Sequence, residues 1–390
     1  MRLRENSWRE QLSLIPNKST VKKRILFHAA SMGEFEQAKS IIEIIKRKTD
    51  YEIIVSFFSP SGYQNQLNYK YADYILYLPI DTKKNVKLFL DIISPDIAVF
   101  IRYEYWYNFL SELEKRNIPS VMICGTEPGN NLLKKGIGKK IFQNIIEKYS
   151  RIYTMGKSHT EFFQQMKYSG ELITSADTRF DRIWDKVNNS KNTDLNKSNL
   201  KHELTFVCGS TWLPDEEIIL KSVQSLSQEI NLIIAPHEPT NEHIKSLKKI
   251  YPNSLLLSEL EDSFDNIVAE IIIVDSVGKL LSLYSLADFV YVGGGFGSGV
   301  HSLAEPAGYG VPLACGEKIK SSPDVPELLK ENALEIIYNH KNLSSWIESN
   351  FSENYRNKIG VKTQNYIKSG LGWSEIIAED LIKMIKKIYD

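Results

Sequence analysis

One carboxylate, Glu34, follows a short apolar run in the segment HAASMGE (28–34). Ser31 and Gly33 favour a tight turn from a strand into a helix, which would place Glu34 in the first helical turn. The helix dipole would stabilise its charge there, and this structural role is the commoner explanation of such a residue. The alternative is a general base, whose carboxyl group would need partial burial to become more basic.

A charged pair among four aromatic residues occurs in RYEYWYN (102–108). Aromatic faces beside Arg102 and Glu104 would suit a sugar or a lipid headgroup, but aromatic packing at a helix start explains the pattern equally well. Further along, Arg179 lies in DTRFDR (177–182). Its planar guanidinium could bind a phosphate or a carboxylate through two hydrogen bonds, although a salt-bridged loop is the commoner arrangement.

The second half of the chain has four polar segments, each after an apolar run. They are GSTW (209–212), PHEP (236–239), DSVGKL (275–280) and GGGFGSGVHSLAEP (293–306). Five glycines in seven residues (293–299) would leave backbone N–H groups open to an anion, and a helix beginning near Ser302 would add its positive end. Glu305 could accept hydrogen bonds from ribose hydroxyls. Together these segments predict a nucleotide-binding domain.

Alternating strands and helices must position these segments, because short apolar runs alternate with helical patterns along the whole chain. Strands are expected at 24–29, 52–58, 74–78, 97–101, 120–124, 151–154, 204–208, 232–235, 271–274, 289–292 and 311–315. The polar stretch 188–202 predicts an interdomain linker. We therefore predict an α/β fold of two Rossmann-like, doubly wound domains that face each other across a cleft, with ligands at the carboxyl ends of the strands.

The composition of the chain restricts its function further. Its 390 residues include 48 Lys and Arg against 48 Asp and Glu, so there is no general electrostatic signature of nucleic-acid binding. A P-loop motif is absent, which argues against a P-loop ATPase. With no Cys/His cluster and no Asp-x-Asp pair, we expect no metal ion and no cofactor. The three cysteines predict core residues in a reducing compartment.

No uncharged apolar run is long enough to span a membrane, and residues 1–23 lack the apolar region of a signal peptide. Composition alone therefore predicts a cytosolic protein. Basic residues do cluster near the N-terminus, where they could form a solvated tail or a basic face. They are Arg2, Arg4, Arg9, Lys22, Lys23 and Arg24.

Eight collinear motifs resemble the 3-deoxy-D-manno-octulosonic acid (Kdo) transferases of lipid A and lipopolysaccharide biosynthesis. These motifs are HAASMGE, FFSPSGY, LPID, EYWYN, DTRFD, GSTW, GGGFGSGVHSLAEP and GYGVP. The resemblance implies a GT-B fold with an acceptor-binding domain at 1–190, a CMP-Kdo donor-binding domain at 203–372 and a C-terminal helix, 373–390, that returns to the first domain. It also implies an inverting, metal-independent transfer of Kdo from CMP-Kdo to lipid IVA, the lipid A precursor.

The resemblance carries roles to single residues. Glu34 matches the family's proton acceptor, and Glu104 and Arg179 match two positions that stabilise the transition state. The remaining matches, together with the polar strand ends, define the expected donor (CMP) site. Its residues are Ser210, Pro236, His237, Val277, Gly278, Lys279, Gly294, Gly295, Ser302, Leu303, Ala304 and Glu305.

The chain departs from the family pattern at several donor-site positions. Many members have Arg in place of His237, Met-Gly-Glu in place of 277–279 and Asn-Pro-Leu-Glu in place of 302–305. Contacts made by the backbone would survive these changes, whereas contacts made by the side chains would differ.

Family members usually begin with a hydrophobic anchor, which this sequence lacks. Either the anchor has been trimmed or the protein associates only peripherally with the cytoplasmic face of the bacterial inner membrane. The basic N-terminal cluster beside an apolar acceptor-docking surface would suit such an anionic membrane. Two other functions stay open: an enzyme similar to the nucleotide-sugar 2-epimerases of the same fold, and a non-catalytic glycolipid-binding remnant.

Overall fold

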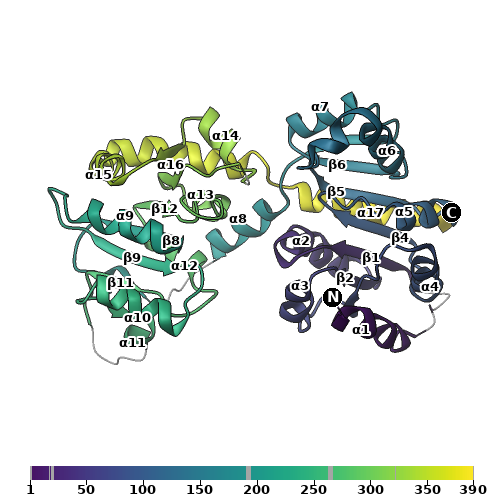
Figure 1. The fold of residues 1–390 in the computed structure, drawn as a ribbon, viewed down its shortest axis with the longest axis horizontal. Coiled ribbons are helices and arrows are strands. Elements are labelled where there is room, and N and C mark those ends of the chain that lie inside the picture. Colours follow the sequence, from purple (N-terminus) through teal and green to yellow (C-terminus); the bar gives the residue numbers. More distant parts are fainter. Residues whose placement is uncertain are drawn as a thin grey trace. The chain divides into compact units, whose positions relative to one another are not determined.

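The computed structural model describes residues 2–16, 18, 22–189, 195–261, 267–320 and 322–389, and only the backbone of residues 2–6. The chain forms two compact units (Figure 1). Unit 1 contains Met1–Arg182 and Gly370–Asp390, and unit 2 contains Ile183–Ser369. The chain passes between them within helix α8 (Arg179–Asn189), before most of the polar stretch 188–202, of which residues 190–194 lie outside the described residues.

Unit 1 is built on a parallel seven-stranded sheet of order β3-β2-β1-β4-β5-β6-β7. The strands are β1 (Arg24–Ala29), β2 (Glu52–Phe57), β3 (Tyr74–Tyr77), β4 (Ile97–Ile101), β5 (Ser120–Gly125), β6 (Arg151–Met155) and β7 (Glu171–Ser175). The strand order reverses between β1 and β4, and ligands of doubly wound sheets bind outside the carboxyl ends of the strands at such a point.

Helices cover both faces of this sheet. They are α1 (Arg2–Ser13), α2 (Met32–Lys48), α3 (Pro60–Gln66), α4 (Lys83–Ile93), α5 (Tyr107–Lys115), η1 (Asn131–Lys134), α6 (Gly136–Ile146), α7 (Lys157–Gln165) and α17 (Trp373–Tyr389). Strand β1 alternates between two cores: Ile25 and Phe27 pack with α2 and α17, whereas Leu26 packs with α4 and α5. Helix α17 (yellow in Figure 1) lies against α2, so the predicted return of the C-terminal helix is confirmed.

Unit 2 repeats this architecture with the order β10-β11-β9-β8-β12-β13-β14. Its strands are β8 (Thr205–Thr211), β9 (Asn231–Pro236), β10 (Leu255–Leu256), β11 (Ile271–Ile273), β12 (Phe289–Val292), β13 (Leu313–Gly316) and β14 (Leu334–Ile337). Its remaining helices are η2 (Lys197–Asn199), α9 (Leu213–Val223), α10 (Asn241–Ile250), α11 (Leu257–Glu261), α12 (Leu280–Leu283), η3 (Tyr284–Leu286), α13 (Ala304–Gly308), α14 (Val325–Lys330), α15 (His340–Ser349) and α16 (Glu353–Lys368). Two doubly wound α/β units confirm the predicted fold class.

Three strands, β7, β10 and β14, have no counterpart in the sequence prediction. All three lie at sheet edges, where partial exposure removes the continuous apolar run that identifies a buried parallel strand. The cysteines behave as predicted, since Cys124, Cys208 and Cys315 are buried and unpaired.

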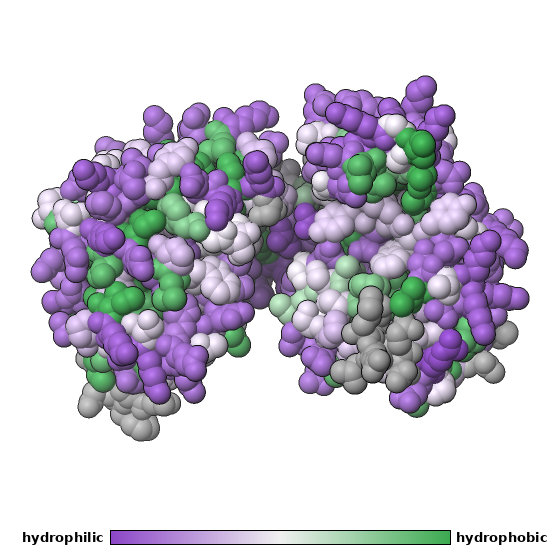
Figure 2. Space-filling model, viewed as in Figure 1, coloured by the Kyte–Doolittle hydropathy of each residue, from purple (hydrophilic) through white to green (hydrophobic). Residues whose placement is uncertain are grey.

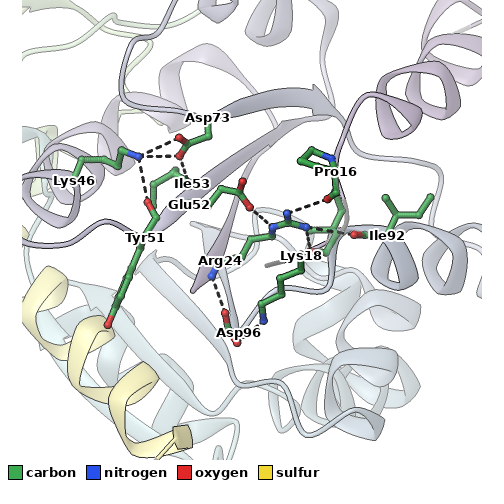
Figure 3. Close-up of polar contacts among 11 residues, drawn as sticks. Pro16, Lys18, Arg24, Lys46, Tyr51, Glu52, Ile53, Asp73, Ile92 and Asp96 are labelled. Carbon is green, nitrogen blue, oxygen red and sulfur yellow. Dashed lines mark hydrogen bonds and ion pairs between the residues drawn. The ribbon is translucent and has the colours of Figure 1, made fainter. Parts of the chain in front are cut away.

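An ionic network holds the amino-terminal edge of the unit 1 sheet (Figure 3). The guanidinium of Arg24 donates to the Glu52 carboxylate and to the Ile93 carbonyl oxygen, 2.7 Å away. Its backbone N–H donates to Asp96 Oδ2 at 2.7 Å, and Lys18 Nζ donates to Asp96 Oδ1 at 2.6 Å. Arg24 is only 1% exposed, so it does not belong to the basic surface predicted near the N-terminus. Of that cluster, the side chains of Arg2 and Arg4 lie outside the described residues.

Candidate active site

Glu34 caps helix α2 directly after β1. The backbone N–H of Glu34 donates to Ser31 Oγ at 3.4 Å, and Glu34 Oε2 accepts from the Ser31 N–H at 3.0 Å, which together form a capping box. Glu34 is nonetheless 5% exposed. Burial, followed by the Glu104 carboxylate, raises the pKa of Glu34 above its ordinary value, against the opposing effects of the Ser31 hydrogen bond and Arg102. The capping role and the basicity that a general base needs therefore coexist in one carboxyl group.

Glu104 lies after β4, where the structure brings it close to Glu34. It is 4% exposed, and the indole N–H of Trp106 donates to its carboxylate. His28, fully buried at the end of β1, has its Nε2 3.4 Å from Glu104 Oε2. The other ring nitrogen, Nδ1, lies 3.1 Å from the Ser56 carbonyl oxygen and so is placed to donate to it. The Glu104 carboxylate thus accepts from the Trp106 indole and lies beside the His28 ring.

Arg102 directly follows strand β4. Its backbone is left-handed, with φ of +68°, and its N–H donates to the Ile123 carbonyl oxygen at 2.9 Å. Its side-chain Nε is buried without a hydrogen-bond partner in the described part of the chain. The sequence indicated Arg102 only as half of a charged pair, because its backbone conformation follows from the neighbouring strand and not from the local residue types.

Arg179 begins helix α8 and is held by Asp177. Its Nε and Nη2 lie 2.9 and 2.6 Å from Asp177 Oδ2. Burial would raise the pKa of Asp177, but the charge and hydrogen bonds of Arg179 outweigh it and lower that pKa. Gln37 Nε2 donates to Asp177 Oδ1 at 3.1 Å, and Gln37 lies one turn after Glu34 on α2. The structure therefore ties the loop that carries Arg179 to the helix that carries Glu34.

The expected donor-site residues gather at the carboxyl edge of the unit 2 sheet. Ser210 ends β8 with a left-handed φ of +54°, and Pro236 and His237 end β9. Residues 277–279 follow β11, and Gly294 and the rest of the glycine-rich segment follow β12. Because all of these strands are parallel, their carboxyl ends share one edge of the sheet.

The glycine-rich segment differs from its prediction. The N–H groups of Gly293, Gly297 and Gly299 donate to backbone carbonyls, and the N–H of Gly294 donates to Asp215 Oδ2 at 2.9 Å. The prediction that these N–H groups are open to an anion is therefore wrong for four of the five glycines. Close packing explains Gly293 and Gly294 instead: a Cβ at Gly293 would lie 2.4 Å from the Ser210 carbonyl oxygen, and one at Gly294 would lie 2.3 Å from the Gly299 carbonyl oxygen.

Buried Asp215 organises this loop. Its Oδ2 also accepts from the Trp212 N–H at 3.0 Å, and Tyr291 donates to Oδ1 at 2.8 Å. Burial raises the pKa of Asp215. This role could not be predicted, because Asp215 and Gly294 are far apart in the chain. The short helix α13 begins at Ala304, slightly later than the expected start near Ser302.

Three rings form a stack at the same edge. The ring centroids of His237 and His301 are 4.1 Å apart, and those of Trp212 and His237 are 5.0 Å apart. Trp212 Nε1–H donates to His301 Nε2 at 3.1 Å. Burial, with a smaller effect of His237, lowers the pKa of His301 to about 4, so this imidazole is neutral at pH 7. Sequence reasoning selected His237 but missed Trp212 and His301, because only the fold brings the three together.

The other donor-site residues differ in how exposed their side chains are. Ser302 Oγ is buried without a hydrogen-bond partner among the described residues, which leaves it available to a ligand. Leu303 and Ala304 are fully buried core residues, so only their backbone could contact a ligand. Val277 is exposed, and Lys279 Nζ lies 2.9 Å from Glu261 Oε1.

Within the described ranges, no group of three or more His, Cys, Asp or Glu side chains is placed to hold a metal ion. The helices of those ranges also include none that combines the length and low charge of a membrane span.

Comparisons with known proteins agree with these features. Residues 6–182 match the model of a family described as 3-deoxy-D-manno-octulosonic-acid transferase (kdotransferase). A bifunctional glycosyltransferase/methyltransferase of Fusobacterium nucleatum is 26% identical over 89% of this chain, which spans 58% of that relative's length. A 3-deoxy-D-manno-octulosonic acid transferase of Chlamydophila psittaci is 27% identical over 78% of this chain and 71% of its own.

Solved structures share the fold at low sequence identity. A UDP-GlcNAc 2-epimerase from Neisseria meningitidis bound to UDP-GlcNAc matches 93% of this chain and 100% of its own, with a TM-score of 0.66 and 14% identity. MurG of Acinetobacter baumannii matches 88% of this chain and 95% of its own, with a TM-score of 0.57 and 12% identity. At such identities only the GT-B fold is shared. Residues 6–182 therefore match the domain of the 3-deoxy-D-manno-octulosonic acid (Kdo) transferase family, relatives of that name align with most of the chain, and the fold is GT-B.

Proposed function

We propose that this enzyme transfers Kdo from CMP-Kdo to lipid IVA with inversion, without a metal ion or cofactor, and with Glu34 as the general base. One observation carries the proposal: the buried Glu34 carboxyl, whose pKa is raised, lies beside Glu104 at the carboxyl ends of β1 and β4. Unit 1 would bind the acceptor, and unit 2 would bind the donor.

The chemistry follows from these groups. The acceptor hydroxyl oxygen attacks the anomeric carbon of Kdo and its proton passes to Glu34, while the bond from that carbon to the CMP phosphate oxygen breaks and its electron pair leaves with CMP. A raised pKa makes Glu34 a better proton acceptor near neutral pH. Glu104, fixed by Trp106, would stabilise positive charge on the sugar ring. Arg179, aligned by Asp177, would stabilise negative charge on the leaving phosphate or on the Kdo carboxylate.

Donor binding in unit 2 would use the free Ser302 hydroxyl and the ring stack. His237 is exposed directly after β9, so its ring could contact the cytosine or the ribose. The packed glycine-rich loop would contact the donor through its backbone surface more than through hydrogen bonds, because Asp215 and backbone carbonyls already accept from most of its N–H groups.

A lipid acceptor requires contact with a membrane, and a surface on η1 and α6 supports it. Leu132, Ile137 and Ile141 are 76%, 80% and 52% exposed, respectively. The stretch 128–146 also carries Lys134, Lys135, Lys139 and Lys140 and no acidic residue. Figure 2 shows apolar surface over the region of α6 with hydrophilic side chains around it. Such a mixture of apolar and basic side chains suits an anionic bilayer.

This lysine-rich surface lies close to the proposed catalytic edge within unit 1. Tyr105, next to Glu104, donates to the Thr126 carbonyl oxygen at 2.9 Å, and its ring contacts Phe142 of α6 at 4.9 Å. We propose that the lysine-rich surface docks on the cytoplasmic face of the bacterial inner membrane. Docking there would bring the sugar of the lipid acceptor to Glu34.

Product analysis with CMP-Kdo and lipid IVA tests the function. We expect mass spectrometry to show Kdo added to the lipid by the wild-type enzyme and none by Glu34→Gln, with CMP binding unchanged in the variant. Full activity of Glu34→Gln would remove Glu34 from its role. Conversion of UDP-GlcNAc to its 2-epimer without an acceptor would support the epimerase alternative, and failure to bind millimolar CMP would support a non-catalytic remnant.

A further inference from the structure

Arg102 is held in a backbone conformation that arginine rarely adopts. A left-handed φ brings the Cβ too close to the following carbonyl oxygen, so such residues persist only where the surroundings enforce them. Here the hydrogen bond from the Arg102 N–H to Ile123 on β5 enforces it. Strand β4 therefore ends in a turn that directs Arg102 toward the loops of the carboxyl edge.

The Arg102 side chain has none of the partners that a half-buried guanidinium normally has. Its Nε is buried without a hydrogen-bond partner, and the side chain forms no ion pair in the part of the chain that the structure describes. Its Cζ lies 5.3 Å from the centroid of the Tyr103 ring. A buried guanidinium N–H that is left unpaired is costly, because burial has removed the water that would otherwise bind it.

The surroundings of Arg102 locate its charge within the edge. Arg102 lowers the pKa of Glu34, of buried Cys124 on β5 and of His159 on α7, in each case as a minor effect beside burial. The guanidinium therefore lies among the loops that follow β1, β4, β5 and β6, close to the proposed general base but without an ion pair to it.

We propose that Arg102 is an anion-binding residue of this site, whose guanidinium pairs with a carboxylate or phosphate of a substrate beside Glu34. The inference rests on the proposed function, in which both substrates carry such groups. Either the Kdo carboxylate of the donor or a phosphate of the acceptor would supply the planar pair of oxygens that a guanidinium binds through two N–H groups.

Steady-state kinetics of Arg102→Gln identify the source of the anion. We expect KM to rise roughly 10- to 100-fold for the one substrate that carries the anion, as for the loss of a charged hydrogen bond. If the anion is the Kdo carboxylate, KM for CMP-Kdo rises while inhibition by CMP, which has no Kdo, is unchanged. If it is a phosphate, KM for lipid IVA rises, and the difference from wild type disappears with a dephosphorylated acceptor.

Two further variants keep the result interpretable. Arg102→Asn removes the charge with a residue that tolerates a left-handed backbone, so it should fold even if Arg102→Gln does not. Arg116→Gln is a matched control, because Arg116 lies on the surface at the end of α5 and pairs with Glu112 and Asp91. We expect wild-type kinetics from the control.

Several outcomes would overturn the proposal. Wild-type KM values in Arg102→Gln and Arg102→Asn, while Glu34→Gln is inactive, would refute the anion site and leave the proposed function intact. A fall in kcat at unchanged KM would assign Arg102 to positioning Glu34 instead. If the wild-type enzyme forms no Kdo product, the function fails. Calorimetric binding of free Kdo and of a deacylated glucosamine disaccharide bisphosphate then decides the anion site, and equal affinity of wild type and Arg102→Gln for both would refute it.

Discussion

The two edges of the unit 1 sheet each hold an arginine, fully buried at one edge and partly buried at the other, and the two arginines have opposite surroundings. At the amino-terminal edge, Arg24 donates to a carboxylate and to main-chain carbonyls, and its neighbours Asp96 and Lys18 are also paired. At the carboxyl edge, Arg102 has a left-handed backbone and an unpartnered Nε. A fully satisfied polar network stabilises a fold, whereas strain and unpaired groups mark a site that a ligand completes.

Glu34 fits the second pattern. Burial and a neighbouring carboxylate raise its pKa, so its charged form is unfavourable in the free protein. The Glu34 carboxyl nonetheless has two roles: its oxygen completes the capping box, and its basicity serves the proposed reaction. The comparison therefore predicts that changes at the carboxyl edge reduce activity and that changes at the amino-terminal edge reduce stability.

The largest effect is expected from Glu34→Gln. Glutamine can still accept the Ser31 N–H in a capping box, so the helix start is preserved while the proton acceptor is lost. Activity should fall roughly 10²–10⁴-fold, the usual contribution of general base catalysis. Initial rates with CMP-Kdo and lipid IVA measure this. Glu36→Gln, on the same helix turn but paired with Lys39 and Arg182, should retain wild-type rates.

Arg24→Gln should have the opposite effect. Removing one partner of a buried ionic network typically destabilises a protein by about 3–5 kcal/mol, because the remaining charges lose their compensation. The network includes Glu52 and, through the Arg24 backbone, Asp96. Urea unfolding followed by circular dichroism would measure the loss. A variant as stable as wild type would contradict the assigned structural role.

The pH dependence of the reaction follows from the raised pKa of Glu34. Protonation removes the base, so kcat should fall tenfold per pH unit below that pKa, which lies above the ordinary value of 4.5. The stability effect has the opposite sign. Since the folded state binds the proton more tightly than the unfolded state, ionised Glu34 lowers stability at neutral pH. Stability therefore rises as the pH falls into the window between the folded-state and unfolded-state pKa values of Glu34. A rate profile with its inflection below 4.5 would contradict the desolvated base.

The smallest effect is expected at the surface of η1 and α6. Each lysine near an anionic bilayer contributes about 1 kcal/mol, so Lys139→Gln/Lys140→Gln should weaken binding to anionic vesicles roughly 10- to 30-fold. Raising the salt concentration should remove the difference. Lys386→Gln/Lys387→Gln, at the exposed end of α17, removes the same charge elsewhere and should leave binding unchanged. Equal losses from both double variants would contradict a localised docking surface.

Local sequence patterns predicted much of this fold. Alternating apolar runs indicated the buried strands, and Ser31 with Gly33 indicated the turn that leads to Glu34. These features depend on neighbours along the chain, as do helix caps and strand periodicity. The short edge strands were missed because partial exposure removes their apolar signal.

Other features depend on contacts between distant segments, so the sequence could not predict them. The Gly294 N–H donates to Asp215, and the His301 ring stacks on His237. Both contacts form because β8 pairs with β9 and with β12. The burial of Arg24 fits neither a solvated tail nor a basic face, and it could not be predicted because its acceptors come from separate segments. For the same reason the sequence could not reveal the strained backbone of Arg102.

The central claim is that the carboxyl edge of the unit 1 sheet serves catalysis, whereas its amino-terminal edge serves stability. One paired measurement tests this claim most directly. It determines kcat and the free energy of unfolding for Glu34→Gln and Arg24→Gln under identical conditions. We predict that Glu34→Gln loses activity without losing stability and that Arg24→Gln loses stability at wild-type kcat. Wild-type kcat in Glu34→Gln, or a large loss of kcat in Arg24→Gln at wild-type stability, would contradict the claim.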